Sequence, residues 1–210
     1  MLSSRSPFLG SVVALSAGVA LGIVSPLLAE VGGSIGQTAH LAFDAGWSWA
    51  ALAFCVGMAR KSKIESVALA SVSLVAAVVS YYLTKLGQGE FLTADLIDPS
   101  GGVTHTSWQS FLSKTAYWGI VACLLGPLLG WAGNMARTEG LHGLAFRVLV
   151  PLIAIVDTSE RLRVEGSLQG AVAETTWGVI RLVAVVVIFA LIGHTVISRR
   201  PRASAGRGRE

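Results

Sequence analysis

The sequence predicts an all-α membrane protein, a bundle of six transmembrane helices with both termini in the cytoplasm. Only 13% of the 210 residues are charged and 53% are hydrophobic, whereas about 25% of the residues in a soluble domain are charged. The hydrophobic residues are gathered in long runs without a charge, at residues 8–29, 66–83 and 116–135. Most Lys and Arg residues fall in alternate connections between such runs, which is typical of a polytopic membrane protein.

Six helices are expected, at residues 8–29, 40–59, 64–84, 116–135, 141–157 and 176–197. The first would be about 33 Å long, enough to cross a hydrocarbon core of about 30 Å. This helix is longer than the apolar core of a signal peptide, which has about 7–15 residues, so we expect a permanent transmembrane span. The fifth segment is short, and Pro151 removes one of its helical hydrogen bonds. We keep it as a span packed inside the bundle, because without it the basic tail would lie outside.

The positions of the cations indicate the orientation, since Lys and Arg concentrate on the cytoplasmic side. With the N-terminus inside, the inner segments hold Arg5, Arg60, Lys61, Lys63, Arg137, Arg147 and the arginines of residues 199–210. The outer segments hold Lys85, Lys114, Arg161, Arg163 and Arg181. Residues 1–198 would thus form a membrane domain in the cell membrane, surrounded by the lipid bilayer. Residues 199–210 would form a disordered basic cytoplasmic tail.

Small residues at a spacing of four indicate how these helices could pack. Gly18 and Gly22 lie on the first helix, and Gly126 and Gly130 on the fourth. Such pairs let two helix backbones approach closely. The third helix offers a matching row, Ser66, Ala70, Ser73 and Ala77. Pro127 is expected to kink the fourth helix.

The longest connection is the outer loop, residues 85–114. Its "DPSGG" segment, residues 98–102, is typical of a turn. The apolar residues that precede this turn could form a short helix on the membrane or over the bundle: Phe91, Leu92, Leu96 and Ile97.

Asp44 is the most informative charged residue, because residues 45–59 alone would form only about 22 Å of helix, too little to span a bilayer. A helix that begins at His40 places Asp44 about one turn below the outer boundary, where a carboxylate must be paired, hydrated or protonated. Arg181 on the sixth helix is expected at a comparable depth. The two charges could form an ion pair that only holds helices together, which gives a structural or regulatory protein.

The same two charges could instead belong to an outward-facing polar site for a small cationic or zwitterionic solute, in a binding or transport component. Clustered aromatic and acidic residues suit such a ligand, although tryptophans also gather at membrane interfaces without a ligand. The further members of this site would be Trp47, Trp49, Trp118 and Trp177, with Asp157 and Glu160 at its rim.

A third interpretation is an intramembrane metal-dependent hydrolase that uses His40 and Asp44, one helical turn apart. His105 is the one further histidine expected on the outer side, and no HExxH or GxSxG motif occurs in the sequence. An enzyme is therefore less favoured. No cofactor is expected, because Cys55 and Cys123 lie inside apolar runs without a CxxC pair. Nothing indicates nucleic-acid binding, and the inner face and loops could dock a protein partner.

Three segments of the chain resemble an uncharacterised family of small actinobacterial membrane proteins. They are "WAALAFCVGMARKSK" (residues 49–63), "YYLTK" (residues 81–85) and "GPLLGWAGNMAR" (residues 126–137). The resemblance covers residues 8–160 and implies six spans without a known activity. In size and topology the chain is also similar to the substrate-binding subunits of energy-coupling-factor vitamin transporters, which hold a ligand near the outer face. Ala14 and Gly18 resemble the row of small residues through which those subunits dock to their partners. The resemblance assigns no ligand-binding residue in this chain.

Overall fold

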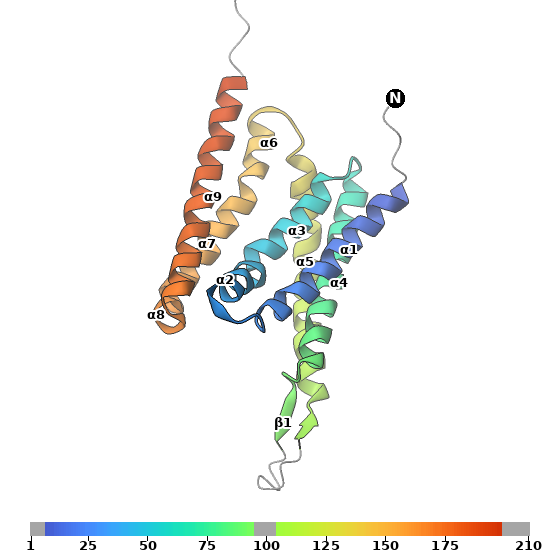
Figure 1. Cartoon of the computed structure of the whole chain (residues 1–210). Helices are drawn as coiled ribbons and strands as arrows, with labels where there is room; N and C mark the ends of the chain where they lie inside the picture. Colours follow the sequence, from blue (N-terminus) through green and yellow to red (C-terminus); the bar gives the residue numbers. More distant parts are fainter. Residues whose placement is uncertain (1–6, 95–103, 199–210) are drawn as a thin grey trace, which may run out of the picture.

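The computed structural model describes residues 7–94 and 104–198, and this part of the chain is almost entirely helical (Figure 1). The helices are α1 (Pro7–Leu28), α2 (Gly33–Asp44), α3 (Gly46–Met58), α4 (Lys63–Gly87), α5 (Trp108–Met135), α6 (Gly140–Arg147), α7 (Leu149–Val164), α8 (Gly166–Gln169) and α9 (Ala171–Ser198). Two short antiparallel strands, β1 (Leu92–Ala94) and β2 (Thr104–Thr106), follow α4 and precede α5.

Five helical stretches of the described chain are long and apolar enough to cross a membrane: Leu9–Leu28, Lys63–Gly87, Trp108–Met135, Gly140–Val164 and Ala171–Ser198. A sixth is obtained if α2 and α3, which bend by 56° at their junction, are counted as one span. The predicted helical fold with several apolar helices, as in a membrane protein, is therefore confirmed.

Helices α1, α3, α4 and α5 form the tightly packed half of the molecule (Figure 1). A Cβ atom on Gly18 would lie 2.2 Å from the carbonyl oxygen of Ser73, and one on Gly22 would lie 2.2 Å from that of Ala77. A Cβ on Gly130 would meet the carbonyl oxygen of Ser66 at 2.5 Å. The small-residue rows predicted on the first, third and fourth helices therefore do meet, because only glycine permits these backbone approaches.

Helices α6, α7 and α9 form the second half, in which α7 packs against both α9 and α3. The predicted fifth segment, residues 141–157, is two helices that meet at Val148 and continue to Val164. The break follows from Pro151, which has no N–H to donate to the carbonyl of Arg147, four residues earlier. The Arg147 side chain instead reaches the end of α5, where its Nε donates to the Ala136 carbonyl oxygen at 2.7 Å.

The predicted second helix, residues 40–59, is wrong in one respect: the chain forms two helices that are separated at Ala45. This residue is extended, with φ −69° and ψ 143°. Helix α2 begins at Gly33, seven residues earlier than expected, and ends at Asp44. The carbonyl groups of Phe43 and Ala45, on either side of the break, both accept hydrogen bonds from the Ser48 hydroxyl at 2.7 Å. Asp44 therefore lies at a helix break rather than inside a continuous helix.

The outer loop also differs from its prediction over the described residues. Phe91 is a buried turn residue and Leu92 begins β1, so neither belongs to a short helix. Leu92 pairs with Thr106 across the hairpin. Leu96, Ile97 and the "DPSGG" turn lie outside the described residues, as does the predicted tail, residues 199–210.

Candidate ligand-binding site

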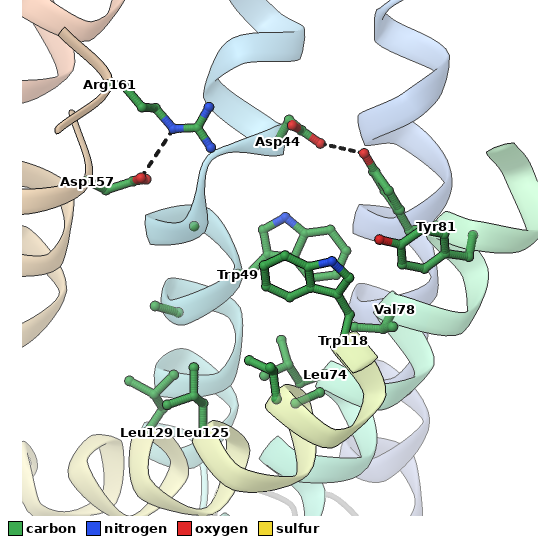
Figure 2. Close-up of a pocket in the computed structure, with 15 residues that line it drawn as sticks. Asp44, Trp49, Leu74, Val78, Tyr81, Trp118, Leu125, Leu129, Asp157 and Arg161 are labelled. Carbon is green, nitrogen blue, oxygen red and sulfur yellow. Dashed lines mark hydrogen bonds and ion pairs between the residues drawn. The ribbon is translucent and has the colours of Figure 1, made fainter. Parts of the chain in front are cut away.

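A pocket of about 410 Å³ lies at the helix break, lined by residues of α2, α3, α4, α5 and α7 (Figure 2). Its volume is within the range of small-molecule sites, about 300–1,000 Å³. Polar groups occupy one end, two tryptophans lie in the middle, and aliphatic side chains line the other end (Figure 2). The polar residues are Asp44, Tyr81, Asp157 and Arg161; the aliphatic end includes Leu74, Val78, Leu125 and Leu129.

Asp44 is the last residue of α2 and is partly buried. Its Oδ1 accepts hydrogen bonds from the Tyr81 hydroxyl at 2.9 Å and the Ser25 hydroxyl at 3.4 Å. No Lys, Arg or His among residues 7–94 and 104–198 makes an ion pair with this carboxylate. The last turn of α2 holds no basic residue, so the negative end of the helix dipole adds to the charge of Asp44. This corner of the pocket therefore favours a cation.

Asp157 is in a different electrostatic situation, although it lines the same pocket. Its Oδ1 accepts a hydrogen bond from Nε of Arg161, one turn along α7, at 3.2 Å. Its Oδ2 accepts from the backbone N–H of Trp47 at 3.3 Å. Because this N–H is at the start of α3, the Asp157 carboxylate caps that helix from a neighbouring one and faces its positive dipole end. Asp157 is thus compensated by two positive groups.

Aromatic rings separate the polar end of the pocket from the aliphatic end. The rings of Trp49 and Tyr81 meet edge to face, with their centroids 5.6 Å apart. Tyr81 and Tyr82 make a similar contact at 5.3 Å. Trp49 and Trp118 both line the pocket, and in Figure 2 both are drawn below Asp44. Aromatic faces next to a carboxylate attract organic cations, most strongly when water is excluded.

His40 does not contribute to a metal centre in the described part of the chain. Its Nδ1 lies 2.9 Å from the carbonyl oxygen of Ser25, so it contacts the same residue of α1 as Asp44. No group of three His, Cys, Asp or Glu side chains suited to a metal ion occurs among the described residues. No described contact therefore favours the hydrolase interpretation.

Four residues that the sequence assigned to the site lie elsewhere. Arg181 is exposed on α9 and does not pair with Asp44. Trp177 is fully buried among Leu41, Ala173 and Leu162, where it packs α9 against α2. Neither Trp47 nor Glu160 lines the pocket, and Glu160 forms an exposed ion pair with Arg163. The predicted pairing is wrong because α9 packs against α7 and α2 rather than beside the α2–α3 break.

Asp44, Trp49, Trp118 and Asp157 do come together in the pocket, as expected. Tyr81 was not among the site residues predicted from the sequence, and Arg161 was predicted on the outer side without a role in the site. Two signals were present: Tyr81 lies in a polar segment at the outer end of the third helix, and Arg161 follows Asp157 by four residues, the spacing of a helical ion pair.

Comparison with protein-family models, with curated proteins and with solved structures finds no match for this chain. The resemblance to an actinobacterial membrane family therefore stays a prediction.

Proposed function

We propose that the protein is a six-span component of the cell membrane that binds a small cationic or zwitterionic solute near the outer face, for uptake or presentation to a partner. The broken pair α2–α3 supplies the second span in this arrangement. The beginning of α1 and the end of α9 lie at the same end of the bundle, together with the α3–α4 connection (Figure 1). That end carries Arg60, Lys61 and Lys63, and the positive-inside rule favours a cytoplasmic location for such a cluster.

The observation that carries this proposal is an uncompensated carboxylate in a pocket at a helix break. Irregular backbone at membrane depth is tolerated where it lines a cavity, and broken helices of this kind form the substrate sites of many transporters. The carboxylate of Asp44 would form an ion pair with the ammonium group of the solute, and the rings of Trp49 and Trp118 would face that group. The Arg161 guanidinium at the same end would meet an anionic group of a zwitterion.

Binding of choline, ethanolamine and glycine betaine to the purified protein tests this proposal, with acetate and glucose as ligands that lack a cation. We expect saturable binding of at least one of the amines. Asp44→Asn should weaken it at least ten-fold, because the amide keeps the shape of the carboxylate without its charge. Glu160→Gln is the matched control, since it removes an acid that does not line the pocket, and it should leave the affinity unchanged. The absence of Asp44-dependent binding for every amine would contradict the proposal.

A second candidate is that Asp44 only fastens helices together, as in a structural membrane protein. Its hydrogen bonds to Ser25 of α1 and Tyr81 of α4 favour this role, because they connect three helices. In that case Asp44→Asn and Tyr81→Phe would lower the free energy of unfolding by similar amounts, and no amine would stabilise the unmutated protein. Amine-dependent stabilisation that Asp44→Asn abolishes would decide for the binding site.

A further inference from the structure

The helices that line the pocket do not close it completely, because two of them, α5 and α7, do not pack against each other. Helix α3 forms its floor, while α5 and α7 form its two sides. Two pocket-lining residues of α5 keep a large part of their surface exposed, Trp118 at 47% and Leu125 at 46%. A molecule in the pocket could therefore be in contact with the bilayer between α5 and α7.

The pocket is long in the direction of the helices and changes from polar to apolar along its length. On α5 it reaches from Trp118 to Leu129, about 16 Å of helix. On α4 it reaches from Tyr82 down to Leu74. No charged residue lines the inner part, where Leu74, Val78, Leu125 and Leu129 lie (Figure 2). A small hydrophilic solute would leave these aliphatic surfaces without a partner.

From this shape we infer that the ligand is a membrane amphiphile with an ammonium headgroup and an alkyl chain, which enters between α5 and α7. The inference rests on the proposed function and names the ligand class for the same site. The ammonium group lies at Asp44 against the rings of Trp49 and Trp118. A phosphate next to it, as in choline or ethanolamine phospholipids, is within the reach of Arg161. The alkyl chain lies along the aliphatic end of the pocket.

Photo-crosslinking tests this inference in nanodiscs of phosphatidylglycerol, a lipid without an ammonium group. The probe is lysophosphatidylcholine with a diazirine in its chain, and lysophosphatidylglycerol with the same chain is the control for the headgroup. We expect the choline probe to label residues 118–129 of α5 at least ten times more than the glycerol probe does. Both probes should label the exposed apolar residues of α9 equally, because lipids surround that helix without specificity.

Two variants separate occupation of the pocket from contact with surrounding lipid. Leu125→Trp fills the aliphatic part of the pocket and should reduce labelling of α5 by the choline probe at least ten-fold. Leu124→Trp is its matched control, because Leu124 is the adjacent residue, is 64% exposed and does not line the pocket. This control should leave the labelling of α5 unchanged.

The outcomes distinguish the inference from the proposed function. If free choline binds in an Asp44-dependent way but the two probes label α5 equally, the solute site stands and the amphiphile is excluded. If neither choline nor the choline probe shows any dependence on Asp44, both proposals fail. Preferential labelling by the choline probe that Asp44→Asn and Leu125→Trp remove, and Leu124→Trp preserves, confirms the inference.

Discussion

Asp44 and Asp157 show that two carboxylates in one pocket can differ in their electrostatic role. Asp157 accepts hydrogen bonds from Arg161 and from the first turn of α3, so its charge is balanced within the protein. Asp44 accepts from two neutral hydroxyl groups at the negative end of α2. Asp157 therefore contacts positive groups of the protein, whereas Asp44 has no cationic partner among the described residues.

Asp157→Asn should lower the free energy of unfolding by about 1–2 kcal/mol, because the amide cannot stabilise the helix N-terminus or the guanidinium as a carboxylate does. Chemical denaturation in detergent measures this change. Glu160→Gln, three residues along the same helix, removes an exposed ion pair and should cost less than about 0.5 kcal/mol. An equal decrease in the free energy of unfolding in the two variants would show that the contact between Asp157 and α3 does not stabilise the protein.

At the scale of elements, two features position the pocket. The break between α2 and α3 brings Asp44 and Gly46 to its polar end. The close contact between α1 and α4 holds Ser25 and Tyr81 together around Asp44. The glycines of α1 make this contact possible, since any side chain there would overlap the backbone of α4.

Gly22→Ala should therefore destabilise the protein by about 1–3 kcal/mol, the usual cost of overpacking, although alanine is the better helix former. Gly119→Ala is the matched control in another apolar helix. Nothing lies within 4 Å of a Cβ atom there, so this variant should be neutral or up to about 1 kcal/mol more stable. Chemical denaturation of both variants in the same detergent measures the change in the free energy of unfolding. If Gly22→Ala left this free energy unchanged, α1 would be able to move away from α4 without an energetic cost.

At the scale of the whole molecule, the helices divide into a compact group, α1, α3, α4 and α5, and a more exposed group, α6, α7 and α9. Helix α2 connects the two groups through its contacts with α1 and α9. The pocket lies where the groups meet, because α3 packs against α7 while α5 does not. A movement of α7 and α9 as a unit would change the width of the opening.

The proposed six-span arrangement predicts which positions react from outside the cell. In a Cys55→Ala, Cys123→Ala background, Gln109→Cys should react with a membrane-impermeant maleimide in intact cells. Glu139→Cys should react only after the membrane is permeabilised. Both positions are exposed; Gln109 is in the first turn of α5, and Glu139 follows the C-terminal end of α5. The reverse pattern of reaction would mean that the orientation is inverted. Reaction of both positions in intact cells would show that α5 does not cross the membrane.

The sequence by itself determined the all-helical fold class, most of the long apolar helices and the small-residue contacts between them. These properties depend on runs of apolar residues and on spacings within one helix, which are local. It also identified Asp44, Trp49, Trp118 and Asp157, because polar residues near the end of an apolar run share a depth in the membrane.

Only the tertiary structure decided which charges meet. A sequence gives the depth of a residue along its helix, but not the direction in which the side chain points or the helix that packs beside it. For this reason Arg181 was chosen as the partner of Asp44, although Tyr81 and Ser25 contact that carboxylate and Arg161 is the cation of the pocket. The break at Ala45 was missed for the same reason: Asp157 of α7 caps the start of α3, and this contact exists only after the helices have packed.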